Sequence, residues 1–193
     1  MKKFKLTSEF IVDISGVKLF RIKALIEFGN VKAGDLGGYI EKEENLSHMG
    51  DAWVSDDARI SGNAQVFGNA QVFGDAWVFG NARVSGNAQV FGNARVFGNA
   101  WVSGNARVSG DTQVFGDARV SGDKDYAYAH GFGSCNRTTT FFRLKDGDVG
   151  VRCGCFYGTL AQFRDKVCET HGETKKAQEY LMLADLMEIR FKN

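Results

Sequence analysis

Residues 136–143 of this sequence gather side chains that can bind a small anion. The set comprises Asn136, Arg137, Thr138, Thr139, Thr140, Phe142 and Arg143. Guanidinium groups bind phosphates through paired hydrogen bonds, hydroxyls provide further donors, and aromatic rings stack on nucleotide bases. The stretch therefore predicts a binding site for a small nucleotide-type ligand. Alternating threonine and phenylalanine is also typical of a polar edge strand that binds nothing, and both interpretations stay open.

A second set of side chains has the chemistry of a zinc site. Cys153 and Cys155 point the same way if they lie on a strand, and Cys168 and His171 are three apart on the helix expected to follow. Zinc takes four such sulfur and nitrogen ligands. The spacing is weaker than paired Cys-x-x-Cys motifs, and reduced cysteines are common in cytosolic cores. We expect no metal and no cofactor, with zinc as the alternative.

The elements that position these residues follow from a six-residue repeat between Ala52 and Val120. The unit is Ala, a variable residue, Val, then Phe or Ser, Gly, and Asn or Asp, in twelve successive copies. Ala and Val lie two apart and so point to one side of a short strand, whereas Gly and Asn or Asp favour a corner. Three units close a triangular coil of 18 residues, so the twelve units predict about four coils of a parallel β-helix.

Several segments resemble known proteins. The unit is similar to the hexapeptide repeat of left-handed β-helix proteins, in which an inward aliphatic residue is followed four residues later by a small one, as Val66 is by Ala70. Residues 27–40 (EFGNVKAGDLGGYI), 44–48 (ENLSH), 138–142 (TTTFF) and 153–158 (CGCFYG) resemble hexapeptide-repeat proteins of phages and prophages. The resemblance covers nearly the whole chain and implies the left hand, a phage origin and three-fold self-association.

The non-repeating ends are expected to cap the β-helix, because open coil ends would recruit other strands. We expect an N-terminal cap at 1–50, the hexapeptide-repeat β-helix at 51–122, and a connector with an α+β module at 123–193. The first cap is predicted to hold a β-hairpin around Ser15-Gly16. Its end should form one degenerate repeat unit, with Leu46 in the Ala position and His48 in the Val position.

The C-terminal module is predicted to have ββαα order. Two strands at 138–145 and 149–156 flank Asp146-Gly147-Asp148, which is a hairpin signal. A capping box at residues 159–162 begins the first helix, and a second helix is expected over 175–190. The fold class is therefore an all-β core with a small α+β appendage.

Five of the six phenylalanines in the repeat fall on two of the three predicted faces, and Phe67 falls on the third. Stacking by 18 residues places Phe73 and Phe91 on one face, and Trp77, Phe79, Phe97 and Phe115 on another. Aromatic side chains in vertical ladders stabilise the sheet by stacking, yet such ladders also approach the largest apolar patch that a monomer normally exposes. We therefore predict self-association through these residues, as a homotrimer.

Composition narrows the class of protein. The chain has 24 Lys and Arg residues and 23 Asp and Glu residues, which gives a net charge of +1. This balance provides no excess of positive charge to attract nucleic acid or an anionic membrane. We see no signal peptide and no apolar run long enough to span a bilayer, and expect a cytoplasmic protein, in the bacterial host if phage-encoded.

The resemblance also raises an enzymatic alternative, since many left-handed β-helix proteins are acyltransferases. They need a general-base histidine, often beside a loop that interrupts the coils. Here no histidine lies between His48 and His130, and no loop interrupts the repeat. We expect a non-catalytic oligomeric binding protein that sequesters a nucleotide-type ligand, hypothetically a host defence signal. A purely structural or interaction scaffold is the alternative, and an acyltransferase using His130 is the less favoured one.

Overall fold

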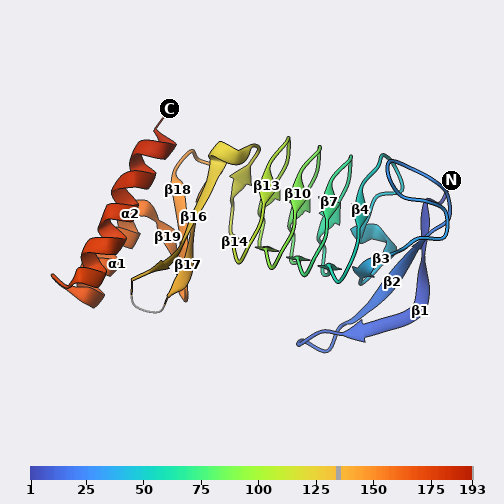
Figure 1. Cartoon of the computed structure of the whole chain (residues 1–193), viewed down its shortest axis with the longest axis horizontal. Helices are drawn as coiled ribbons and strands as arrows, with labels where there is room; N and C mark the ends of the chain where they lie inside the picture. Colours follow the sequence, from blue (N-terminus) through green and yellow to red (C-terminus); the bar gives the residue numbers. More distant parts are fainter. Residues whose placement is uncertain (134–135, 193) are drawn as a thin grey trace.

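The computed structural model describes residues 1–133 and 136–192. The chain forms a β-solenoid of about five turns, with a strand hairpin at its N-terminal end and a module of one sheet and two helices at the other end (Figure 1). The predicted β-helix with two non-repeating ends is confirmed. The left hand that the resemblance implies stays a prediction.

Twelve two-residue strands and one longer strand build three stacked parallel sheets, which are the faces of the solenoid. The first face stacks β4 (Trp53–Val54), β7 (Gln71–Val72), β10 (Gln89–Val90) and β13 (Arg107–Val108). The second face stacks β3 (Leu36–Ile40), β5 (Arg59–Ile60), β8 (Trp77–Val78), β11 (Arg95–Val96) and β14 (Gln113–Val114). The third face stacks β6 (Gln65–Val66), β9 (Arg83–Val84), β12 (Trp101–Val102) and β15 (Arg119–Val120).

The register between coils is 18 residues, as the repeat predicts. Val90 pairs with Val72 on one side and Val108 on the other, and the inward valines and alanines are completely buried. The corner glycines hold a positive φ, for example 65° at Gly86. A Cβ on Gly86 would also lie 2.9 Å from the backbone nitrogen of Gly104 in the next coil, so both backbone angle and coil spacing require glycine there.

The solenoid begins earlier than the sequence predicts. Strand β3 pairs in parallel with β5, and Leu46 forms a parallel bridge with Val66. Leu46 therefore occupies a Val position, so its predicted place in an Ala position is wrong. The register there is 20 residues, because the turn after Leu46 carries two extra residues. His48 lies outside the core, where its ring stacks on Phe4 at 4.3 Å and its Nδ1 accepts a hydrogen bond from the backbone of Lys3.

A β-hairpin extends the second face beyond β3. Strands β1 (Phe4–Val12) and β2 (Lys18–Ala24) pair antiparallel, and β2 pairs with β3. The carboxylate of Asp13 closes the turn by accepting hydrogen bonds from Ser15 and Val17. The predicted hairpin is confirmed, and it projects away from the axis of the coils (Figure 1).

The C-terminal module contains four strands where the sequence predicts two. The strands are β16 (Tyr126–Phe132), β17 (Arg137–Arg143), β18 (Val149–Cys153) and β19 (Phe156–Thr159), all antiparallel in chain order. The helices are α1 (Leu160–His171) and α2 (Lys175–Phe191). The capping box at Thr159 begins α1 as predicted, and α1 ends at its C-cap Gly172. The predicted connector is instead largely the strand β16, which pairs with β17.

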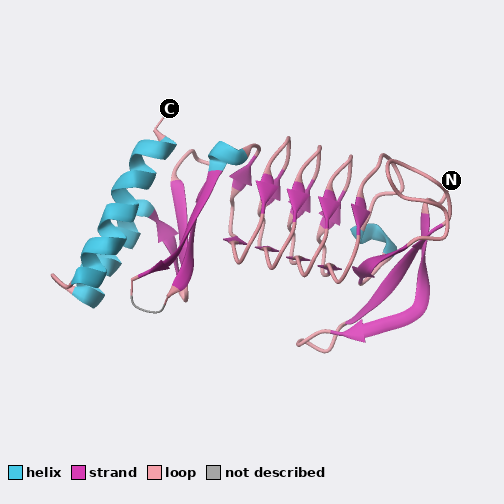
Figure 2. Cartoon of the chain, in the orientation of Figure 1, coloured by secondary structure: helices cyan, strands magenta, loops and turns pink. Residues whose placement is uncertain are grey.

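The sheet of the module lies between the helices and the last coil (Figure 2). On one side, Phe141 and Val151 pack with Phe163 of α1 and Ala184 of α2. On the other side, Tyr126 and Phe142 join the core of the solenoid. The module therefore closes the C-terminal end of the solenoid with aromatic side chains.

The N-terminal cap supplies hydrogen-bond donors to backbone carbonyls of the solenoid, and the C-terminal cap supplies acceptors to backbone N–H groups. At the positions on either side of each inward valine, the N–H groups of a coil donate to carbonyls of the next coil, as Trp53 N donates to Ala70 O at 3.0 Å. The first coil thus leaves carbonyls unpaired and the last coil leaves N–H groups unpaired, and each buried group needs a partner.

At the N-terminal end the partners are donors. Lys3 Nζ donates to Ala52 O at 2.8 Å and to Gly50 O at 3.1 Å. The side chain of Asn45, in the 3-10 turn η1 (Glu43–Asn45), donates to Ala64 O at 2.8 Å.

At the C-terminal end the partners are acceptors. Gln113 N donates to Thr140 Oγ1 at 3.1 Å. Two carboxylates of the 3-10 turn η2 (Asp123–Asp125) accept two more N–H groups: Arg107 N donates to Asp123 at 3.0 Å, and Ser121 N donates to Asp125 at 2.9 Å.

Candidate functional site

The seven predicted ligand-binding residues lie on or just before β17, and they do not form one surface. Successive side chains on a strand point to opposite sides, and both sides of this sheet are covered. Thr140 and Phe142 face the last coil, whereas Thr139 lies on the helix side and donates to Cys153 Sγ at 3.2 Å. All three side chains are buried, so they serve packing and capping of the solenoid.

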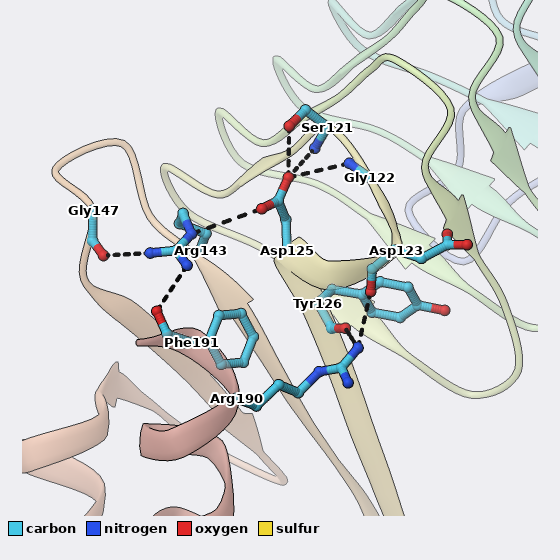
Figure 3. A network of polar contacts seen from close by, with 9 residues as sticks. All are labelled: Ser121, Gly122, Asp123, Asp125, Tyr126, Arg143, Gly147, Arg190 and Phe191. Atoms are coloured by element: carbon cyan, nitrogen blue, oxygen red, sulfur yellow. Dashed lines mark hydrogen bonds and ion pairs between the residues drawn. The ribbon is translucent and has the colours of Figure 1, made fainter. Parts of the chain in front are cut away.

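Arg143 is held in the contact between module and solenoid (Figure 3). Its guanidinium donates to Phe191 O at 2.9 Å and to Gly147 O at 3.2 Å, and its Nε lies 3.7 Å from a carboxylate oxygen of Asp125. Arg190 of α2 donates nearby to the backbone carbonyls of Asp123 and Tyr126. Arg143 therefore fixes the docking of α2 on the solenoid.

The start of β17 is accessible. Asn136 and Arg137 are exposed, and Asn136 has a φ of 48° that amide side chains tolerate. Thr138 is half-buried, and its hydroxyl hydrogen-bonds Nδ1 of His130 at 2.9 Å. Of the predicted set, Arg137 is the member that lines a cavity together with other functional groups.

That cavity is a cleft of about 190 Å³ between the module's sheet and its two helices. Three basic side chains line it: Arg137 from β17, and Lys166 and His171 from α1. Its aromatic wall consists of Phe156, Phe163 and Tyr180, and Cys153, Gly154, Val167 and Thr170 complete the lining. Among the described residues that line the cleft there is no carboxylate, so its charge favours an anion.

The aromatic wall is a packed unit. Phe163 meets Tyr180 edge-on with ring centroids 5.6 Å apart, and Phe156 lies 5.5 Å from Phe163. The ring of His171 stacks on Tyr180 at 5.8 Å. A rigid wall of rings beside cationic groups can hold a planar ring by stacking and a negative group by charge-assisted hydrogen bonds.

The structure does not assemble the alternative zinc set. Cys155 and Cys168 are exposed and Cys153 is half-buried, while His171 stacks on Tyr180. Within residues 1–133 and 136–192, no group of three His, Cys, Asp or Glu side chains is close enough to hold a metal ion. Cys153 ends β18, Cys155 lies in the turn between β18 and β19, and Cys168 lies on α1.

Comparison with known families bears on the solenoid. Residues 88–104 and 100–114 match the family model of the YdcK beta solenoid repeat. The repeat is similar to that of YdcK. A comparison with curated proteins finds no match. The YdcK-like repeat thus agrees with the coils of the structure and says nothing about the cleft in the terminal module.

The coils carry the two predicted aromatic ladders. On the first face, Phe73 and Phe91 stack with centroids 4.9 Å apart and rings nearly parallel. On the second face the successive centroid distances are 4.7 Å for Trp77–Phe79, 4.7 Å for Phe79–Phe97 and 4.4 Å for Phe97–Phe115. Stacking leaves every ring half-buried. The ladders are confirmed, and self-association through them stays a prediction.

Sequence reasoning missed most of the cleft. Lys166 and Tyr180 lie on two helices and meet Arg137 only through tertiary packing. The available signal was the spacing of Phe163, Val167 and His171 at intervals of four, which places them on one face of α1. That spacing predicts a buried face but not the strand end that it faces.

In the described part of the chain, no helix is long and apolar enough to cross a membrane.

Proposed function

We propose that this protein is a non-catalytic oligomeric binding protein that sequesters a small anionic ligand of nucleotide type in the cleft of its C-terminal module. The observation that carries the proposal is the convergence of Arg137, Lys166 and His171 on a wall of aromatic rings. Ligand sites combine apolar walls with a few convergent polar groups in this way.

The size of the cleft limits what enters it. A volume of about 190 Å³ suits a single ring, since a cavity of about 150 Å³ accommodates benzene. We place a base against the aromatic wall of the cleft, with its phosphate groups at the rim beside Arg137 and Lys166. A ligand with one buried ring and exposed phosphates suits this cleft better than one that must be enclosed entirely.

The biological setting of the proposal comes from the resemblance to phage and prophage hexapeptide-repeat proteins. A phage protein that holds a nucleotide without converting it would lower the concentration of a host defence signal in the bacterial cytoplasm. Such sequestration needs binding alone, which is consistent with a cleft built from binding groups.

The phenylalanine ladders support assembly as a homotrimer. A half-exposed ladder presents apolar surface that association would remove from water. The ladders also suit the alternative function of a purely structural scaffold, in which the cleft has no ligand.

A thermal-shift panel of cyclic dinucleotides, ADP-ribose derivatives and mononucleotides tests the binding function. We expect at least one member to raise the Tm of the protein, and Arg137→Ala to weaken its affinity at least about ten-fold, because a charge-assisted hydrogen bond contributes about 1.5–3 kcal/mol. Lys166→Ala should act in the same direction.

Lys124→Ala is the matched control, since Lys124 is exposed in η2 and lies outside the cleft. It removes one positive charge and should leave the affinity unchanged. If no member of the panel stabilises the protein, or if Lys124→Ala weakens binding as much as Lys166→Ala, the cleft is not the site and the scaffold function remains.

A further inference from the structure

A groove on the third face has a chemistry different from that of the cleft. It has a volume of about 410 Å³ and is lined by Gln65, Arg83, Trp101 and Arg119 of the strands, together with the asparagines of the neighbouring corner. The strand residues form one column, because β6, β9, β12 and β15 are stacked in register. The groove therefore runs along the solenoid axis.

Trp101 is the unusual member of this column. Its side chain is 37% exposed in a column whose other strand residues are polar, and no second aromatic ring of the described residues contacts it. Its Nε1 donates to Ser85 Oγ at 2.9 Å, which holds the indole against the coil. An exposed, fixed indole with polar neighbours provides a flat surface for the apolar face of a sugar or another ring.

Arginines lie on both sides of Trp101 in the column. Arg83 is exposed, and its side chain makes no hydrogen bond or ion pair with the described part of the chain, although its backbone N donates to Ala100 O at 2.9 Å. Arg119 lies over the indole at 6.0 Å and donates from Nη1 to two backbone carbonyls, so its Nη2 and Nε remain for a ligand. The two arginines are two coils apart, roughly 9–10 Å along the axis.

The neighbouring corner supplies further donors. Asn63, Asn81 and Asn99 form a ladder in which each amide N–H bonds the next side chain at 3.2–3.3 Å, and Asp117 ends the ladder. Each amide uses one of its two N–H groups along the ladder, so the second can point into the groove. Lys42 adds a positive charge at the other end, bonded to Asn63. No carboxylate is among the described residues that line the groove, and apart from Asp117 at the end of the ladder the charged groups named here are cations.

We propose that this groove binds an extended acidic polysaccharide. In a chain of uronic acids with two-fold symmetry, every second carboxylate points to the same side and one sugar ring lies between them. The column Arg83–Trp101–Arg119 offers the matching order of cation, flat ring and cation. The amide ladder faces the hydroxyl groups of the same chain, which accept its free N–H donors. This site is independent of the nucleotide cleft.

The repeat itself provides well-matched variants for the test. Glutamine occupies the same strand position in Gln65, Gln71 and Gln89, so Arg83→Gln and Trp101→Gln should fold normally. Arg95→Gln is the control, because Arg95 is an exposed arginine at the same position on the second face. Calorimetry with oligogalacturonate as the probe should show binding by the full-length protein, and no binding of neutral dextran.

We expect Arg83→Gln and Trp101→Gln each to weaken oligogalacturonate binding about ten-fold, and Arg95→Gln to leave it unchanged. Raising the salt concentration should weaken binding, because the contact is partly ionic. No binding of oligogalacturonate, equal losses in all three variants, or tighter binding of oligo-dT than of oligogalacturonate would overturn the proposal.

Discussion

Lys3 is buried at the N-terminal end of the solenoid, where its ammonium group donates to the carbonyls of Gly50 and Ala52. The side chain is only 2% exposed, and its ammonium lies 4.5 Å from the ring centroid of Phe28. Burial lowers the pKa of Lys3 to about 8, while the nearby charge of Asp51 partly offsets that shift. A cation here satisfies two carbonyls that the coil itself leaves unpaired.

The lowered pKa of Lys3 predicts a pH dependence of stability. Between about pH 8 and the unfolded pKa of 10.5 the unfolded chain binds more protons, so the free energy of unfolding should rise with pH in that window. We expect a rise of about 2 kcal/mol from pH 8 to pH 10. Burial raises the pKa of Tyr126 and Tyr157, so these phenols stay protonated over most of this range.

Denaturant unfolding of wild type and Lys3→Met at several pH values checks this prediction. The variant lacks the titrating group, so its pH slope should be smaller by the stated amount. It should also be less stable at pH 10 by about 1–3 kcal/mol, because two buried carbonyls lose their donor. Parallel pH profiles of the two proteins would show that Lys3 does not titrate as described.

The strands show which part of the architecture a sequence can reveal. Valine and alanine recur every six residues, so the three faces, the coil register and the aromatic ladders follow from counting. The six-residue spacing does not predict the position of Leu46, because two extra residues precede β4 and no spacing rule marks them. It also fails at β16, where tyrosine alternates with alanine and glycine, and the strand forms because β17 offers an edge to pair with.

The ladder on the second face predicts how the protein assembles. Serine replaces phenylalanine at the same position in other units, such as Ser61 and Ser85, so the double variant Phe79→Ser/Phe97→Ser should keep the fold. Each lost ring stack costs about 0.5–1.5 kcal/mol. Light scattering should give a trimer mass for wild type and a monomer mass for this variant.

Phe67→Ser provides the control, because Phe67 has no aromatic partner among the described residues and belongs to neither ladder. It should leave the mass unchanged. A wild-type protein that is monomeric, or a double variant with the wild-type mass, would contradict assembly through this ladder.

At the scale of the whole molecule, the C-terminal module both caps the solenoid and forms a cleft. The sequence alone does not separate these two roles. The strand 137–143 looks like a single binding stretch, but its side chains divide between capping the last coil and lining a cleft. Thr140 and Phe142 belong to the cap, and Arg137 to the cleft. Sequence alone gives the residue types, whereas the packing of β17 between solenoid and helices decides which of them can meet a ligand.

The cleft depends on three separate segments, which explains why it was only partly predicted. Arg137 comes from a strand, Lys166 from α1 and Tyr180 from α2. Local patterns predict each element, and the capping box at Thr159 even predicts the start of α1. No local pattern predicts that the three side chains meet, because that follows from how the helices pack on the sheet.

The most direct test of the account is mass spectrometry of small molecules released when the purified protein is denatured. The protein should be expressed in a bacterium in which the relevant nucleotide signal is produced. We predict a phosphate-bearing compound with an aromatic ring, present in wild type and strongly depleted in Arg137→Ala/Lys166→Ala. Its presence at equal amounts in both proteins, or the release of no such compound from wild type, would contradict the claim that the cleft sequesters a nucleotide-type ligand.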